Sequence, residues 1–301
     1  MFKFEFEARE DGFDFRRCVT SGQTFRWREV APGHWNGVDG DTWYVVREGQ
    51  SRLHVESNFD QSRFERLFRL DLDARMIETE ILRSGPELRG LLQDRRGLRI
   101  LRQSRREEVF YGFLCSANNH LQRIAGMVAK LAAIGPKIEG ALFEARSFPT
   151  SKSIARLGES KMRELGFGYR AATISRCAEA LGENGESWLA ELAEDGYDSA
   201  WRSLTRLPGI GRKLADCICL FALDYPEAVP VDTHVWAALT ELYHPDWRGL
   251  ALSELRYATA SDRFRERFGK NAGWAHQYLF VNRADLHRKG GLDQVWSKKT
   301  C

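Results

Sequence analysis

The chain has 301 residues, 43% of them hydrophobic and 29% charged, a composition that is typical of a globular protein and excludes extensive disorder. This length predicts two domains, because single hydrophobic cores stop growing at about 250 to 300 residues. The formal charge of +3 and the isoelectric point near 8.5 permit a nucleic-acid partner but do not require one.

The sequence contains no recognisable targeting or membrane signal. Its first residues, MFKFEFEARE, carry charges at alternating positions and lack the apolar centre of a secretory signal. No apolar run approaches the roughly 20 residues of a membrane span. We therefore expect an intracellular protein that is not secreted and has no membrane partner.

The cysteines are scattered along the chain and include no CxxC pair, which is not the pattern of a disulfide framework. Two of them are two positions apart on an expected helix, so their side chains point to different sides, and HExxH is also absent. This pattern argues against structural zinc and against an iron–sulfur cluster bound by C-terminal cysteines. We also expect no catalytic metal and no cofactor. The cysteines are Cys18, Cys115, Cys177, Cys217, Cys219 and Cys301.

Alternating apolar residues predict strands in the first part of the chain. Phe2, Phe4 and Phe6 alternate with charged residues, as on a strand with one apolar face. The runs QTFRWREV, TWYVVRE and RLHVES are rich in aromatic and β-branched residues and are separated by turn sequences such as GVDGD at 37–41. These segments predict an antiparallel sheet.

Helical spacing replaces the strand pattern from about residue 100, where apolar residues recur at three- and four-residue intervals. The predicted fold class is therefore α+β, with an antiparallel β-rich domain over residues 1–100 and an all-helical domain over residues 101–301. The residues that carry the helical pattern are Val109, Phe110, Phe113 and Leu114, then Leu121, Ile124, Met127, Val128 and Leu131.

The sequence LPGIGRKLADCICLFAL at 207–223 predicts a helix–hairpin–helix. The preceding run DSAWRSLTRL suits a helix, PGIG interrupts it, and an apolar helix follows that contains Lys213. Gly209 and Gly211 expose backbone amides where this helix begins, and its positive end suits a phosphate. Considered alone, the motif is equally compatible with a helix turn that carries a solvent-exposed lysine.

A second motif, AVPVDTHVW at 228–236, follows this helix. It places Asp232 at the expected N-cap of another helix and His234 just after it. Considered alone, such an aspartate is most often only a helix cap, and such a histidine only a surface residue.

Together these motifs resemble the helix–hairpin–helix, Gly/Pro–Asp (HhH-GPD) superfamily of DNA base-excision glycosylases, and within it the 8-oxoguanine DNA glycosylases. Further segments are similar to that family in the same order along nearly the whole chain. They are SGQTFRW at 21–27, FLCSANNHLQRIAGMV at 113–128, LGFGYRA at 165–171 and NAGWAHQYLF at 271–280. The resemblance implies a helical HhH-GPD domain after the β-rich part, and double-stranded DNA containing oxidised guanine as the partner of a monomeric, intracellular enzyme.

The resemblance implies that Lys213 is the nucleophile, which attacks C1′ of the deoxyribose, expels the damaged base and forms a Schiff base. An amine attacks only when it is uncharged, and we expect apolar surroundings and the positive helix end to favour that form. Asp232 is implied to stabilise the positive charge that develops as the glycosidic bond breaks.

Other residues are implied to bind the flipped base. The carbonyl of Gly22 would accept the N7–H that distinguishes 8-oxoguanine from guanine, Phe280 would stack on the base, and Cys217 would contact it. Considered alone, Gly22 suits a turn before a strand, and the other two suit a helical core. His276 stands where eukaryotic members of the family carry a glutamine that contacts the Watson–Crick edge, so base recognition departs from the family at this position.

A further set is implied to contact the strand opposite the lesion. Asn118 would fill the vacated space, Arg123 and Arg170 would donate to the orphan cytosine, and Tyr169 would wedge the opposite strand. Asn118 could instead cap the next helix, expected to run to about residue 133, and the arginines could contact phosphates. His120 replaces the third asparagine of the family's usual run.

The backbone of the hairpin is implied to bind phosphates together with one histidine, and its carbonyls to hold a structural cation. The phosphate contacts are assigned to Gly209, Gly211 and His234, and the cation to the carbonyls of Thr205, Leu207 and Ile210.

The predicted function is that of a bifunctional glycosylase that excises 8-oxoguanine opposite cytosine and then nicks the abasic site by β-elimination. Two alternatives remain open. One is a related glycosylase for another lesion, such as an alkylated purine. The other is a helix–hairpin–helix module that binds DNA without catalysis and makes no use of Lys213 and Asp232.

Overall fold

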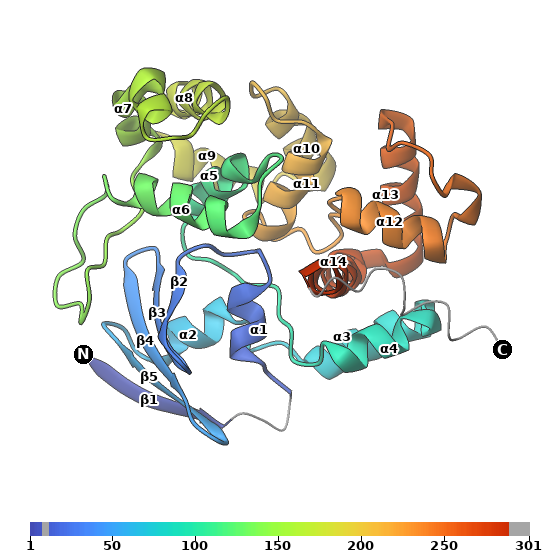
Figure 1. The fold of residues 1–301 in the computed structure, drawn as a ribbon, viewed down its shortest axis with the longest axis horizontal. Coiled ribbons are helices and arrows are strands. Elements are labelled where there is room, and N and C mark those ends of the chain that lie inside the picture. The colour runs from blue at the N-terminus through green and yellow to red at the C-terminus, as the bar shows by residue number, and fades with distance from the viewer. Residues whose placement is uncertain (8–11, 289–301) are drawn as a thin grey trace. The chain divides into compact units, whose positions relative to one another are not determined.

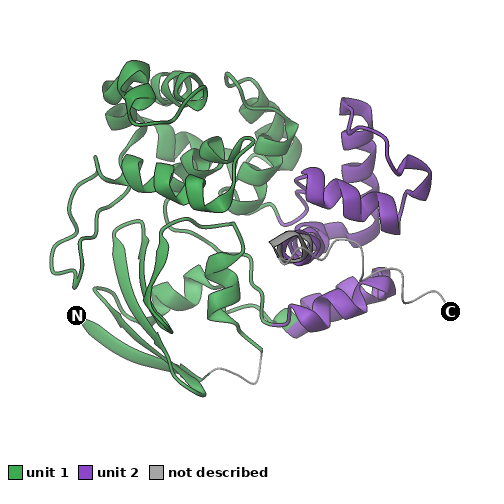
Figure 2. Ribbon diagram, viewed as in Figure 1, with its two compact units in different colours: residues 1–74, 97–225 green, residues 75–96, 226–301 purple. Residues whose placement is uncertain are grey.

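The computed structural model of the chain describes residues 1–7 and 12–288 (Figure 1). The last cysteine, Cys301, lies outside these residues. Packing divides the chain into two compact units, residues 1–74 with 97–225 and residues 75–96 with 226–301 (Figure 2). Residues 75–96 belong to the same unit as the C-terminal helices, and the domain boundary near residue 100 stays a prediction.

Unit 1 contains a five-stranded antiparallel sheet in the order β1-β5-β4-β3-β2. The register pairs Phe4 of β1 with Val55 of β5, and Val46 of β4 with both Val55 and Trp35. The strands are β1 (Phe2–Glu7), β2 (Trp27–Ala31), β3 (His34–Asp39), β4 (Thr42–Glu48) and β5 (Arg52–Ser57).

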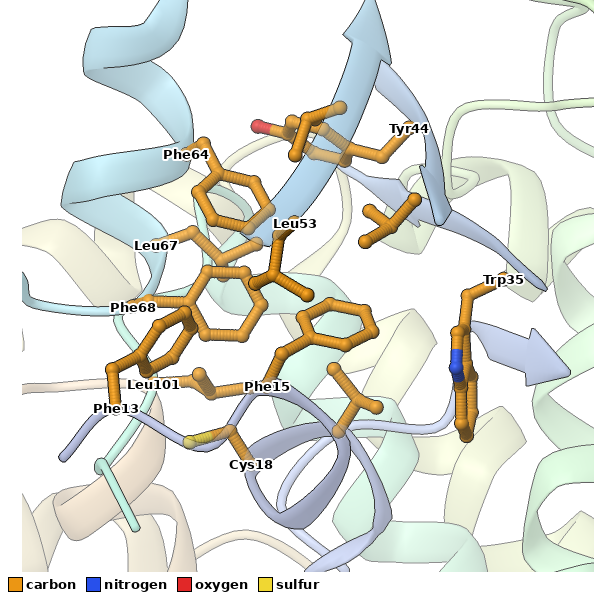
Figure 3. Packing of buried hydrophobic residues seen from close by; sticks show 13 residues of the cluster. Phe13, Phe15, Cys18, Trp35, Tyr44, Leu53, Phe64, Leu67, Phe68 and Leu101 are labelled. Atoms are coloured by element: carbon orange, nitrogen blue, oxygen red, sulfur yellow. The ribbon is translucent and has the colours of Figure 1, made fainter. Parts of the chain in front are cut away.

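Two short helices, α1 (Phe15–Thr20) and α2 (Gln61–Leu67), cover one face of this sheet with aromatic side chains (Figure 3). Phe64 and Phe68 lie one helical turn apart at the end of α2, with ring centroids 4.6 Å apart. Phe15 of α1 meets the indole of Trp35 edge to face. Burial of each such ring stabilises the fold by about 1.5 to 3 kcal/mol. This packing against the sheet explains why helices as short as α1 and α2 are stable.

The rest of unit 1 is helical, and α5 lies at its centre. Residues 107–115 of α5 are buried without interruption, and the helix packs against α6, α8, α9 and α11. Its first amides, those of Arg106 and Glu107, donate to the carboxylate of Glu186, which suits the positive end of a helix. These helices are α5 (Arg106–Ser116), α6 (Leu121–Ala132), α7 (Ser151–Glu164), α8 (Arg170–Leu181), α9 (Gly185–Leu192), α10 (Tyr197–Thr205) and α11 (Arg212–Phe221).

Unit 2 is helical, and α14 forms its centre by packing against α4, α12 and α13. Tyr278 of α14 donates its hydroxyl to Glu78 of α3, and Asn271 donates to Glu80, so the early helices are fixed to the late ones. The helices are α3 (Ala74–Ser84, which starts at the last residue of unit 1), α4 (Arg89–Asp94), α12 (Thr233–Leu242), α13 (Glu254–Phe268) and α14 (Ala272–Arg288), with 3-10 turns at Pro86–Leu88, Pro245–Trp247 and Gly269–Asn271.

The predicted fold class, an antiparallel sheet followed by helices, is confirmed. Two details were wrong. The sequence GVDGD was expected to be a turn, but β3 runs through Asp39 and the turn is shorter. Helices α1 to α4 also precede residue 100, in the part that was predicted to be β-rich and for which no helix was predicted.

Candidate active site

A helix–hairpin–helix is formed by α10, residues 206–211 and α11, as the sequence predicted. Gly209 has a φ of +78°, which glycine adopts without steric cost. Gly211 is the N-cap of α11, and no side chain caps the helix there. A Cβ added at Gly211 would meet nothing within 4 Å, so the protein leaves the space beside these amides open. An uncapped helix start with open space beside it suits a phosphate.

Lys213 lies in the first turn of α11 and is half-buried. The following residues of the helix, Leu214 to Phe221, are all buried. Cys217 is one helical turn after Lys213 and is 3% exposed. Among the buried residues is Asp216, whose carboxylate accepts the hydroxyl proton of Tyr197 from α10 and so ties the two helices together. The lysine therefore stands at the partly exposed start of an otherwise buried helix.

The hairpin is supported from behind by α8. Thr173 of α8 lies against Gly209, where an added Cβ would come within 2.6 Å of its Oγ1. The thiol of Cys177, one turn further on, donates to the carbonyl of Pro208 at 3.5 Å. Burial raises the pKa of Cys177 to about 12, so the thiol keeps the proton that it donates. This support was missed in the sequence, although the two residues share one face of a helix.

The first residue of the same helix, Arg170, contacts the loop that contains Asn118. Asn118 is exposed and has a φ of +46°. The guanidinium of Arg170 is buried and donates to the carbonyls of Ala117 and Asn118 at 2.5 to 2.9 Å. Tyr169 is 58% exposed and donates its hydroxyl to the same carbonyl of Ala117 at 2.9 Å. The structure thus brings three of the predicted opposite-strand residues, Asn118, Tyr169 and Arg170, together.

The remaining opposite-strand residue, Arg123, is exposed in the first turn of α6. Asn118 does not cap this helix, because the N-cap is His120, whose Nδ1 accepts the amide of Arg123 at 3.4 Å. The capping alternative for Asn118 was therefore wrong. The histidine that replaces the family's third asparagine has a structural role in this chain.

Gly22 lies in a loop after α1, with a φ of +81°. The next residue, Gln23, is 1% exposed and fixes the loop. Its amide nitrogen donates to the carbonyl of Arg99 at 2.7 Å, and its amide oxygen accepts the N–H of Leu101 at 2.7 Å. Ser21 donates to the carbonyl of Cys18 at 2.8 Å. The residues on both sides of Gly22 thus position its backbone. The part played by Gln23 was not predicted, although it belongs to the quoted SGQ motif.

In unit 2, Asp232 is the N-cap of α12 and accepts the amide of Val235 at 2.8 Å. The predicted cap is confirmed. The carboxylate is only partly buried, so capping leaves it accessible for a second role. His234 is half-buried on the same first turn.

His276 and Phe280 lie one turn apart on α14, also in unit 2. Their rings are nearly parallel, with an interplanar angle of 18° and centroids 6.3 Å apart. His276 is 3% exposed, whereas Phe280 is partly exposed. The phenylalanine is therefore the more accessible of the two for stacking.

No group of three His, Cys, Asp or Glu residues that could hold a metal occurs in the part of the chain that the structure describes. The carbonyl of Leu207 accepts the amide of Ile210 at 3.2 Å, and a cation at the carbonyls of the hairpin stays a prediction. None of the described helices is long and apolar enough to cross a membrane.

Two family models match adjacent parts of the chain. The family model of the HhH-GPD superfamily base excision DNA repair proteins matches residues 111–268, which contain the hairpin, Lys213 and Asp232. The model of the 8-oxoguanine DNA glycosylase N-terminal domain matches residues 4–109, which contain the sheet and Gly22. The chain is thus a base-excision repair protein of the helix–hairpin–helix class.

Similar proteins show to which family within this class the chain belongs. An N-glycosylase/DNA lyase of Arabidopsis thaliana is 33% identical over 92% of this chain and 79% of its own. The crystal structure of a Clostridium acetobutylicum 8-oxoguanine glycosylase/lyase with double-stranded DNA is 27% identical, with a TM-score of 0.81 over 92% of this chain and 93% of that one. The chain belongs to the 8-oxoguanine DNA glycosylase family.

A 3-methyladenine DNA glycosylase of Archaeoglobus fulgidus is 24% identical, with a TM-score of 0.70 over 94% of this chain and 98% of that one, and so shares the fold alone. The predicted enzyme class, a DNA N-glycosylase with lyase activity, is confirmed at the level of the family.

Proposed function

We propose that this chain removes 8-oxoguanine from duplex DNA through Lys213. The observation that supports this most is the position of Lys213 in a chain of this family. Lys213 lies in the first turn of α11, which directly follows the hairpin and has no side-chain cap. The ε-amine attacks C1′, the glycosidic bond breaks, and its electron pair leaves with the base. The nitrogen gives one proton to the departing base, and the ring oxygen O4′ takes a proton from water as the sugar ring opens, which leaves a protonated Schiff base. Loss of a proton from C2′ then expels the 3′ phosphate by β-elimination.

Asp232 stabilises the positive charge that develops on the deoxyribose as the base departs. The cap geometry supports this role, because the amide of Val235 donates to the carboxylate and so orients it, while the carboxylate stays partly accessible. A carboxylate that is already oriented needs no reorganisation during the reaction.

Base recognition rests on the carbonyl of Gly22. 8-Oxoguanine carries an N7–H donor where guanine has an acceptor, so guanine would place two acceptors against each other. This mismatch costs about 1 to 3 kcal/mol, which is roughly 10- to 100-fold in discrimination. The rigid anchoring of the loop by Gln23 supports this role. Phe280 stacks on the base, and Cys217 and His276 contact it.

On the opposite strand, Asn118 enters the space left by the flipped nucleotide and Tyr169 wedges the stack. Arg123 and Arg170 donate to the orphan cytosine. The Clostridium structure, which contains cytosine opposite 8-oxoguanine, supports this preference. Arg170 is buried and donates to the carbonyl of Asn118, so it also orients the Asn118 loop in addition to any contact with the cytosine. The amides of Gly209 and Gly211, together with His234, hold backbone phosphates.

The test uses duplexes that contain 8-oxoguanine opposite each of the normal bases, with borohydride added to reduce any Schiff base. The wild-type protein should form a covalent adduct with the cytosine duplex, and Lys213→Gln should form none. Asp232→Asn should still bind the duplex but turn over far more slowly. Base release without an adduct would contradict the lysine mechanism. Binding without base release would reduce the chain to a DNA-binding module.

A further inference from the structure

Two of the three non-glycine residues with positive φ in the described chain are paired with each other. Arg69, after α2, has a φ of +49°, and Asp224, after α11, has a φ of +65°. The guanidinium of Arg69 donates to the carboxylate of Asp224, 155 residues further along the chain. A left-handed backbone costs about 1 to 2 kcal/mol at such residues, so the surrounding contacts have to maintain both conformations.

Further arginines complete this cluster within unit 1. Arg102 Nε donates to the second carboxylate oxygen of Asp224 at 3.1 Å, and its Nη1 lies 3.6 Å from Asp71. Arg99 is 0% exposed and donates to the carbonyls of Arg69 and Leu72 at 3.1 and 2.8 Å. We call Arg69, Asp71, Arg99, Arg102 and Asp224 the clasp.

The clasp connects two elements of the site. One is α11, which begins with Lys213 and whose C-terminal turn runs into Asp224, since the amides of Leu223 and Tyr225 donate to the carbonyls of Ile218 and Cys219. The other is the segment around Arg99 and Leu101, to which Gln23 is bound. The contacts therefore run without a break from the helix of the nucleophile to the loop of Gly22.

The clasp also lies at the ends of the segments that form unit 1. The chain leaves this unit after residues 74 and 225 and returns at residue 97. Asp71, Arg99 and Asp224 each lie within three residues of one of these points. The side chain of Arg69 is 8% exposed, whereas that of its partner Asp224 is 40% exposed. Removal of the carboxylate would leave a buried guanidinium without this ion-pair partner, which is costly.

We propose that Asp224, held by Arg69 and Arg102, is a positioning residue that fixes Lys213 relative to the Gly22 loop. The inference rests on the proposed function, because it takes Lys213 as nucleophile and Gly22 as the base contact. Excision of 8-oxoguanine needs both groups on the same nucleotide. Strand cleavage at a preformed abasic site needs only the amine. Loss of the clasp therefore lowers excision more than it lowers cleavage.

The test compares the two activities in the same variants under single-turnover conditions, below the unfolding temperature of each protein. Asp224→Asn removes the charge but tolerates positive φ. Asp224→Gly adopts the same backbone without strain and removes the side chain, so it separates positioning from stability. Arg102→Gln is a milder change at a residue that is 30% exposed. Glu164→Gln is the control, since it removes an exposed pair with Lys161 outside the clasp.

Both Asp224 variants should lower the ratio of excision to abasic-site cleavage by about 10- to 100-fold, because small misplacements of reacting groups have effects of this size. Arg102→Gln should lower the ratio less, and Glu164→Gln should leave it unchanged. If both activities fall equally, the clasp only stabilises the fold and the inference is overturned. If the wild type excises nothing, the proposed function fails instead, which the same experiment shows directly.

Discussion

Arg26 and Glu108 form a buried ion pair between the segment after the Gly22 loop and the first turn of α5, with Nη1 and Oε2 3.3 Å apart. Burial raises the pKa of Glu108 to about 7, and the nearby carboxylate of Asp39 acts in the same direction, while Arg26 opposes it. Burial likewise raises the pKa of Asp39 to about 6, against the hydrogen bond from the amide of Ser104.

A raised carboxyl pKa means that the folded protein binds the proton more tightly than the unfolded chain. The stability from Glu108 is therefore fully present below its ordinary pKa of 4.5 and is lost as the pH rises through about 7. Glu108→Gln replaces the carboxyl group with a neutral amide, so the free energy of unfolding should no longer fall through ionisation at this position. We expect the free energy of unfolding of the variant to rise relative to that of the wild type between about pH 5 and pH 8, by up to about 3 kcal/mol.

Urea unfolding at a series of pH values measures this difference. Glu164→Gln, at an exposed position, is the control and should run parallel to the wild type. Parallel curves for Glu108→Gln would show that the buried carboxyl group has no effect on the pH dependence.

Gln23→Glu tests the anchoring of the Gly22 loop. The change replaces the buried NH₂ donor with an oxygen that faces the carbonyl of Arg99. We expect a loss of about 1 to 3 kcal/mol in the free energy of unfolding at neutral pH. The loss should shrink in acid, because a protonated carboxyl group can donate one hydrogen bond again. A loss that is equal at all pH values would point to a packing defect instead.

The two hairpin glycines provide a matched pair. Gly211→Ala meets no protein atom within 4 Å and has an ordinary φ of −89°, so stability should change by less than about 0.5 kcal/mol. If phosphate binds there, the methyl group should still weaken duplex binding, by about tenfold. Gly209→Ala should lower both the stability and the affinity for the duplex, because Gly209 has a positive φ and lies against Thr173. Fluorescence anisotropy measures the affinity, and full affinity in Gly211→Ala would contradict the phosphate site.

Arg170 and Arg123 were predicted to share a role, but they differ in burial. Arg170→Ala should lower the free energy of unfolding by about 1.5 to 3 kcal/mol, because charged hydrogen bonds to two loop carbonyls are lost. Arg123→Ala should leave stability nearly unchanged and lower only the excision opposite cytosine. Hydrogen exchange of the amides at 117–119 should rise in the first variant alone. Equal exchange in both would show that Arg170 does not order the loop.

The sequence predicted those helices and strands whose ends are marked by helix-breaking or turn-forming residues. Helices α10 and α11 were placed correctly because Pro208, Gly209 and Gly211 interrupt a clear helical pattern. Strand β3 was missed because its sequence contains glycine and aspartate, which favour turns, and the strand is held by pairing with both neighbours. Helices α1 and α2 depend on aromatic packing against the sheet, and no local sequence pattern indicates such packing.

The supporting contacts of the site could not be predicted for a related reason. Gln23 and Leu101 are 78 residues apart, and Arg69 and Asp224 are 155 apart. No period or spacing connects such residues before the chain is folded. The candidate site residues themselves came from the family resemblance, while the groups that hold them came from the structure.

Peptide mapping shows whether the ε-amine of Lys213 bonds to the deoxyribose. The borohydride-reduced adduct with an 8-oxoguanine duplex is digested, and mass spectrometry locates the residue that carries the sugar. We expect one modified peptide, with the added mass on Lys213. A modification on any other residue would contradict this expectation.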